Sequence, residues 1–147
     1  MSKLYNKGFT LIELILVIAF IAILAGVSLP IFKTFQTEND FSLAASTIAQ
    51  TMRTAALYSQ AVSHDSPWGV KLENGKAILF KGANFATRDN TFDKIFDLPS
   101  SLQVDGLIEE NYTIFTGLPT QVGMIVLTDI DGRTKEISIN AAGLLDY

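Results

Sequence analysis

Apolar residues dominate the start of the chain. From Leu14 to Phe32 the sequence has 19 consecutive residues without a charge. As a helix this run is roughly 28 Å long, which matches the hydrocarbon thickness of a bilayer. A buried helix of a globular protein is the alternative, but such a helix normally keeps a polar face. The run therefore predicts a single membrane span.

The helical pattern continues beyond the span and becomes amphipathic. Gln50, Arg53 and Gln60 fall on its polar faces. Apolar residues recur at spacings of three, four and seven, namely Phe41, Ala45, Ile48, Met52, Ala55 and Val62. We expect one helix over residues 9–63, with this stripe packed on the domain that follows.

From Pro67 onward the residues alternate as in β-strands. WGVKLE (68–73) and KAILFK (76–81) flank Asn74-Gly75, which predicts a hairpin with a type I′ turn. Residues 82–106 should fold back on the sheet, with short strands at 95–98 and 102–104. Further strands are expected at YTIF (112–115), GMIVLT (123–128), RTKEISIN (133–140) and GLLDY (143–147). The chain is thus predicted to be an α+β protein, in which a long N-terminal helix packs on a C-terminal antiparallel β-sheet domain.

The charges around the span predict its orientation. Lys3 and Lys7 precede it without an acidic residue, whereas Lys33 is followed by Glu38 and Asp40. The positive-inside rule places the N-terminus in the cytoplasm and residues 33–147 across the membrane. The net charge of −4 disfavours nucleic acid as a partner, because nucleic-acid binding depends on neutralising phosphates.

The N-terminus departs from a standard secretory signal. Its apolar run is longer than the usual span of about 7–15 residues, and no clear A-x-A site follows it. The small residue beside the basic segment is Gly8, which lies before the apolar run. A protease acting there would leave the run on the mature protein; an uncleaved anchor is the alternative.

The stretch KGFTLIE and the apolar helix after it resemble the class III signal of type IV pilins and type II secretion pseudopilins, over residues 1–32. The resemblance implies that a prepilin peptidase cuts between Gly8 and Phe9, and that Phe9 is then N-methylated. Glu13 stands at the fifth position of the mature chain, where this family has its signature glutamate. The resemblance also implies that the protein is a subunit of the bacterial inner membrane, which other machinery assembles into a filament.

Glu13 needs a partner, because an unpaired charge near the bilayer centre costs about 3 kcal/mol. Cleavage after Gly8 would create a protonated amine on Phe9. Residues four apart share a helix face, so Glu13 can pair with the amine of its own chain. It can instead pair with the amine of a neighbouring subunit, which we expect because misplaced subunits would then leave a charge unpaired. An interfacial glutamate without a role is the alternative.

Gly26 and Pro30 predict a weak point at the far end of the span. Pro30 has no N–H to bond the carbonyl of Gly26, and glycine is a poor helix former. We expect a kink or local unwinding, which the resemblance suggests loosens during filament formation. A proline tolerated in a membrane helix is the alternative.

Catalysis and zinc binding have little support. Ser63-His64-Asp65 has the residue types of a catalytic triad, but side chains adjacent in sequence do not converge. One histidine and no cysteine offer few zinc ligands. We therefore expect neither an enzyme nor a cofactor.

Two features near the end of the chain suggest weaker alternatives. Asp129, Asp131 and Gly132 resemble a fragment of a calcium loop, but the full pattern is absent, so a hairpin turn is favoured and no metal is expected. Arg133 and Lys135 suggest a DNA contact, which the neighbouring acidic residues oppose.

The whole pattern divides the chain into a cleaved leader (1–8), a transmembrane and assembly half of the helix (9–32), an amphipathic half (33–64) and a β-rich exterior domain (65–147). Residues 117–147 resemble the end of H-type minor pseudopilins and their FimT-like relatives. The favoured function is a minor pseudopilin of a type II secretion-like system, with prepilin peptidase, other subunits, assembly machinery and the lipid bilayer as partners. The alternatives are a minor type IV pilin for adhesion, motility or DNA uptake, and an anchored β-domain that binds an exterior ligand without polymerising.

Overall fold

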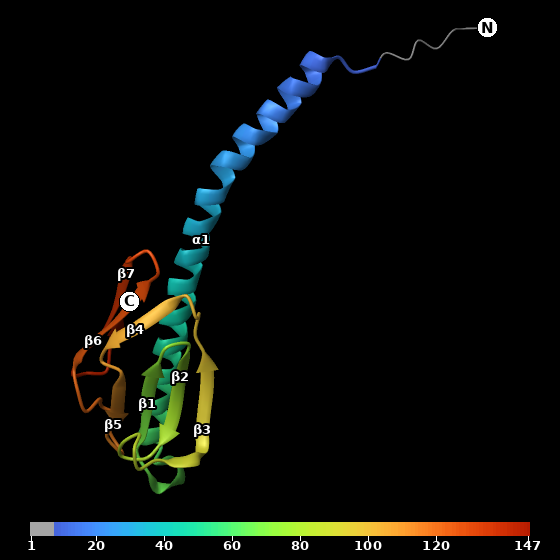
Figure 1. Ribbon diagram of the computed structural model, residues 1–147. Helices are drawn as coiled ribbons and strands as arrows, with labels where there is room; N and C mark the ends of the chain where they lie inside the picture. The colour runs from blue at the N-terminus through green and yellow to red at the C-terminus, as the bar shows by residue number, and fades with distance from the viewer. Residues whose placement is uncertain (1–7) are drawn as a thin grey trace. The chain divides into compact units, whose positions relative to one another are not determined.

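One long helix leads into a β-domain. The computed structural model describes residues 8–147, with side chains for residues 8–26 and 34–147. The chain divides into two compact units, Met1–Gln36 and Thr37–Tyr147, and helix α1 (Leu11–Gln60) passes from the first into the second (Figure 1). The predicted long N-terminal helix is confirmed, with an earlier end than expected.

The end of α1 is fixed by a contact with the first strand. The buried Ser59 Oγ accepts a hydrogen bond from the Trp68 N–H at 2.8 Å and donates to the Trp68 carbonyl at 3.4 Å. Val62 then adopts a left-handed φ of 52°, and a short 3-10 helix, η1 (Ser63–Asp65), follows. Val62 is only half-buried, so its assignment to the apolar stripe was wrong: the helix ends before reaching it.

The second half of α1 buries the rest of the predicted stripe. All five remaining positions lie in the core: Phe41, Ala45, Ile48, Met52 and Ala55. Gln50, Arg53 and Gln60 are exposed, as the helical period requires.

Within residues 8–147, eight strands make up two antiparallel sheets rather than one. The strands are β1 (Trp68–Glu73), β2 (Lys76–Lys81), β3 (Asp89–Asp97), β4 (Leu102–Gly106), β5 (Glu109–Tyr112), β6 (Gly123–Asp129), β7 (Thr134–Ile139) and β8 (Leu145–Asp146). The first sheet has the order β3-β2-β1-β5 and the second β4-β6-β7-β8 (Figure 1). The core lies between α1 and the inner faces of both sheets, and includes Trp68, Leu79, Ile125 and Ile137. The α+β prediction is thus confirmed.

The β1–β2 hairpin forms in the predicted register, with Glu73 opposite Lys76. Its turn is not type I′, which needs positive φ at both central residues, because only Gly75 has one. The side chain of Asn74 instead accepts a hydrogen bond from the Val104 N–H in β4 at 3.0 Å. The turn therefore links the two sheets. The bond to Val104 occurs together with a turn geometry other than the predicted type I′.

The stretch 82–106 supplies β3 and β4, at the two places where short strands were predicted. Residues up to Asp97 fold back on the first sheet, where β3 pairs with β2, whereas β4 pairs with β6 in the second sheet. Phe85 packs edge-on against the buried Phe80 with ring centroids 5.5 Å apart. Gly69, directly opposite Phe80, leaves room for that ring, since a Cβ here would collide with it. The outer face of this sheet therefore has a small apolar core of its own.

The predicted strand at 112–115 is wrong beyond Tyr112. Its strand, β5, lies earlier and has the sequence EENY. The residues after Tyr112 form a turn, in which the Thr113 N–H donates to the Leu118 carbonyl at 2.8 Å. The Phe115 N–H donates to the backbone carbonyl of Ser59, at the end of α1, at 3.1 Å. Gly117 approaches α1 so closely that a Cβ would lie 2.8 Å from the Ala56 carbonyl oxygen. Contacts with the helix thus replace strand pairing.

Candidate functional site

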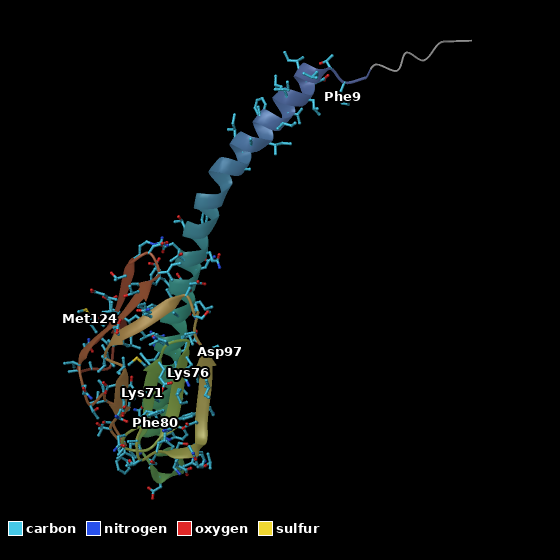
Figure 2. All side chains as sticks on the ribbon, viewed as in Figure 1. Phe9, Lys71, Lys76, Phe80, Asp97 and Met124 are labelled. Carbon is cyan, nitrogen blue, oxygen red and sulfur yellow. The ribbon has the colours of Figure 1, made fainter. Side chains whose placement is uncertain are left out.

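The predicted cleavage site lies just before α1. Gly8 and Phe9 precede the first helical residue, Leu11. Among the described residues, no atom beyond the chain neighbours lies within 4 Å of a Cβ built on Gly8. The Phe9 side chain, labelled in Figure 2, is 86% exposed. The Gly8–Phe9 peptide bond is therefore open to a peptidase.

Glu13 closes the first turn of α1 together with Thr10. The Thr10 N–H donates to Glu13 Oε2 at 3.4 Å, and the Glu13 N–H donates to Thr10 Oγ1 at 3.3 Å. This reciprocal arrangement is a capping box, which satisfies two of the N–H groups that a helix leaves unbonded at its start. The carboxylate also lies at the positive end of the helix dipole.

Thr10 was missed by the sequence analysis, although its signal was present. A threonine followed three residues later by glutamate, just before an apolar run, is typical of a helix N-terminus. Phe9 carries an amide nitrogen in the unprocessed chain, so neither pairing predicted for Glu13 is tested here. Both stay predictions.

Apolar side chains cover the whole circumference of α1 from Leu11 to Leu24. They occupy nearly every position of this stretch and are exposed. Among the described residues, the structure has no helix that is both long and apolar enough to cross a bilayer. The predicted span extends into residues 27–33, whose side chains lie outside the described part.

Helix α1 is continuous through Gly26 and Pro30. Among the described residues, no atom outside its own helix backbone and chain neighbours lies within 4 Å of a Cβ built on Gly26. The Pro30 side chain lies outside the described residues, and loosening during assembly is a property of the filament. The predicted weak point therefore stays a prediction.

Asp129, Asp131 and Gly132 form a hairpin turn between β6 and β7, as favoured from the sequence. The Asp131 and Arg133 N–H groups donate to Asp129 Oδ1 at 2.9 and 2.8 Å. Burial raises the pKa of Asp129, but hydrogen bonds and charge from Arg133 outweigh it and lower the pKa overall. The carboxylate closes the turn.

Arg133 is engaged by the same carboxylate. Its Nε lies 2.8 Å from Asp129 Oδ2. Lys135, on β7, is half-buried, and the next residue is the exposed Glu136. Arg133 thus has an acidic partner in space, and Lys135 has an acidic neighbour in sequence.

His64 lies in η1 with its ring against an aromatic cluster. Its Nδ1 is 3.0 Å from Ser63 Oγ, and its ring centroid is 4.6 Å from that of Phe92. Within the described part of the chain, no group of three or more histidine, cysteine or acidic side chains is placed to hold a metal ion.

Comparison with known proteins identifies the N-terminal segment. Residues 3–29 match a family described as the prokaryotic N-terminal methylation motif. This match includes Gly8, Phe9, Thr10, Glu13 and Gly26. Neither the curated proteins nor the solved structures give a significant match.

The motif and the fold agree on the class of protein. A helix that begins within a methylation motif and ends against an antiparallel β-domain is consistent with a pilin-like fold. The motif supports a pilin-like, membrane-anchored protein that prepilin peptidase processes and that assembles with other pilin-like subunits.

Proposed function

We propose that the chain is a minor pseudopilin of a type II secretion-like system. Prepilin peptidase cuts after Gly8, Phe9 is N-methylated, and the protein spans the bacterial inner membrane once with its N-terminus in the cytoplasm. Assembly machinery then extracts it into a filament. The observation that carries the proposal is the exposed Gly8–Phe9 bond inside the methylation motif, directly before the Thr10–Glu13 cap.

Cleavage changes the electrostatics of this helix end. The new amine of Phe9 is positive near neutral pH and adds to the positive end of the helix dipole. Glu13 offsets this charge. The bond that its carboxylate accepts from the Thr10 N–H is 3.4 Å long, beyond the usual 2.7–3.2 Å, so little is lost when the carboxylate turns to another donor. The amine of a neighbouring subunit is that donor in the proposed filament.

The exposed apolar side chains of α1 from Leu11 to Leu24 support the same function. Side chains such as Ile12, Ile18 and Leu24 cannot remain in water without a large cost, which is about 25 cal/mol for each Å² of apolar surface. Lipid covers them before assembly, and neighbouring helices cover them in the filament. This surface has no use in a protein that remains alone in water.

Intact-protein mass spectrometry tests the processing. The chain is expressed with and without a prepilin peptidase and extracted from membranes. We expect loss of residues 1–8 and the gain of one methyl group on Phe9 only when the peptidase is present. A Gly8→Val variant should stay full-length. An intact N-terminus in the presence of an active peptidase would exclude the proposal.

The secretion role is tested separately from processing. Minor type IV pilins use the same type of N-terminal motif, and the assignment to secretion rests on the resemblance of residues 117–147 to H-type pseudopilins. Deleting the gene should stop export of secreted enzymes and leave twitching motility and DNA uptake intact. The reverse outcome would assign the chain to a type IV pilus.

A further inference from the structure

The outer face of the second sheet is acidic. Side chains alternate along each strand, and Ile125, Leu127, Ile137 and Ile139 point into the core. The alternate residues therefore face outward. We define the outer acidic face as Asp105 on β4, Met124 and Val126 on β6, Glu136 and Ser138 on β7, and Asp146 on β8.

The strand registers set these residues in two rows. Asp105 and Glu136 both lie opposite Val126, on either side of it. In the next row, Met124 lies opposite Ser138, which lies opposite Asp146. An apolar centre of Met124 and Val126 thus has carboxylates around it.

These carboxylates have no cation of their own. Asp105, Glu136 and Asp146 take part in none of the ion pairs formed among the described residues. Lys135 is the one basic residue in the four strands, and it occupies an inward-facing position of β7. Negative charge on this face is therefore left for a partner to neutralise.

A shallow hollow lies in the second row. It has a volume of about 280 Å³ and is lined by Met124, Glu136, Ser138, Asp146 and Tyr147. Met124 and Tyr147 are 48% and 46% exposed, and Figure 2 shows Met124 on the outer side of β6. Sites for small molecules usually have volumes of about 300–1,000 Å³, so the hollow lies just below this range, with room for one long side chain.

The chemistry of the lining defines that side chain. The flexible thioether of Met124 suits an aliphatic stem. Glu136 and Asp146 suit a cationic head, which the ring of Tyr147 also attracts. Lysine and arginine are the side chains that combine a stem and a head of this kind.

We propose that the outer acidic face docks a basic segment of another protein, with a lysine or arginine side chain in the hollow. A second copy of this chain offers few free cations in the unit Thr37–Tyr147. Five basic residues there already form ion pairs within their own chain, namely Lys71, Lys76, Lys81, Arg88 and Arg133, which leaves Arg53, Lys94 and the inward-facing Lys135. Nucleic acid is disfavoured by charge. The proposal concerns the folded unit Thr37–Tyr147 and does not rest on filament assembly.

Methionine NMR of the full chain in a non-ionic detergent tests the proposal. The chain has three methionines, so methyl-¹³C labelling gives few signals. Met124 reports on the hollow, and the buried Met52 reports on the core. The probes are the peptides acetyl-Lys-Val-Lys-amide and acetyl-Glu-Val-Glu-amide. We expect the basic peptide to shift the Met124 signal in a salt-sensitive manner, while Met52 stays in place and the acidic peptide has no effect.

Two variants of equal charge supply the control. The Glu136→Gln/Asp146→Asn variant should lose the shift. The Asp65→Asn/Asp97→Asn variant, which removes two exposed carboxylates outside the outer acidic face, should keep it. An unshifted Met124, an equal shift in both variants, or a parallel shift of Met52 would overturn the proposal. A Met124 signal that moves with protein concentration alone, and stops moving in Glu136→Gln/Asp146→Asn, would make a second copy the occupant and overturn it too.

Discussion

Thr10 and Glu13 hydrogen-bond each other reciprocally across the first turn of α1. Cleavage after Gly8 would leave both residues in place and put a new amine one residue before Thr10. Glu13 then has two possible roles, as the acceptor that caps its own helix and as the charge that meets an amine. A substitution that separates the two roles decides which one assembly needs.

Glu13→Gln keeps the cap and removes the charge, since glutamine serves the same position in a capping box. Glu13→Ala removes both. If assembly needs a charge pair, both variants insert normally but enter filaments at least about tenfold less, because the neighbour's unpaired amine in lipid costs about 3 kcal/mol. Protease protection of the exterior domain measures insertion, and the amount of chain in sheared filaments measures assembly.

The contrast between the two variants contains the decisive outcome. If Glu13→Gln assembles like the original chain and Glu13→Ala does not, capping suffices and the predicted pairing is wrong. If both assemble normally, Glu13 has neither role in the filament. Thr10→Ala gives the cost of the cap alone, about 1 kcal/mol of helix stability.

Ser59 joins the end of α1 to β1, and its loss should destabilise the unit Thr37–Tyr147. Ser59→Ala leaves the N–H of the buried Trp68 without its partner at 2.8 Å, which costs about 1–3 kcal/mol of unfolding free energy. Urea unfolding followed by fluorescence of Trp68, the one tryptophan, measures the change. Ser46→Ala is the control, since its exposed hydroxyl bonds only the Leu43 carbonyl within the helix. Equal midpoints for both variants would refute the argument.

Gly69 cannot be replaced without a clash, because the Phe80 ring and the Glu110 carbonyl oxygen occupy the space that a Cβ at this position would fill. In Gly69→Ala the new methyl group would collide with the Phe80 ring and lie 2.8 Å from the Glu110 carbonyl oxygen. We expect a loss of about 1–3 kcal/mol in unfolding free energy, as for other overpacked sites. Gly123→Ala is the matched control in a strand, where the closest atoms are at 3.6 Å. A similar urea midpoint for the two variants would show that Phe80 moves aside freely.

The parts of the fold that local pattern determines were predictable from the sequence. The β1–β2 and β6–β7 hairpins, the buried stripe of α1 and the turn at Asp129 follow from alternation, helical period and turn chemistry. Thr10 also belongs to this group, because its capping signal is local. The N-terminal motif could be recognised for the same reason, since its basic leader, glycine, aromatic residue and glutamate lie close together in the sequence.

Long-range contacts decide the parts that were mispredicted. Strand β5 contains the buried Glu110, and a charged residue at a buried position does not fit the alternating pattern of a strand. Its Oε1 nevertheless has partners, because it accepts hydrogen bonds from the Thr120 and Gln121 N–H groups at 2.7 and 3.1 Å. The Asn74-Gly75 turn bonds β4 of the other sheet. The division into two sheets depends on such contacts. The outer acidic face became visible only with the registers that join Asp105, Glu136 and Asp146.

The hairpin at Asp129 predicts how stability depends on pH. The pKa of Asp129 is lowered in the folded chain, because the N–H groups of Arg133 and Asp131 and the guanidinium of Arg133 outweigh burial. A carboxylate with a lowered pKa stabilises the fold fully above its unfolded pKa, about 3.9. This contribution is lost as the pH falls through the lower folded pKa, where the group becomes protonated in both states.

Asp129→Asn should therefore lower the urea midpoint at pH 7, and the difference from the original chain should shrink as the pH falls below about 4. Asp131→Asn is the matched control, since it keeps the backbone N–H that bonds Asp129 at 2.9 Å. Its small difference from the original chain should not follow the same pH course. Trp68 fluorescence at a series of pH values measures both differences. The contrary outcome is a difference for Asp129→Asn that stays constant to pH values well below the ordinary aspartate pKa. It would mean that the hydrogen bonds of Asp129, and not its charge, stabilise the turn.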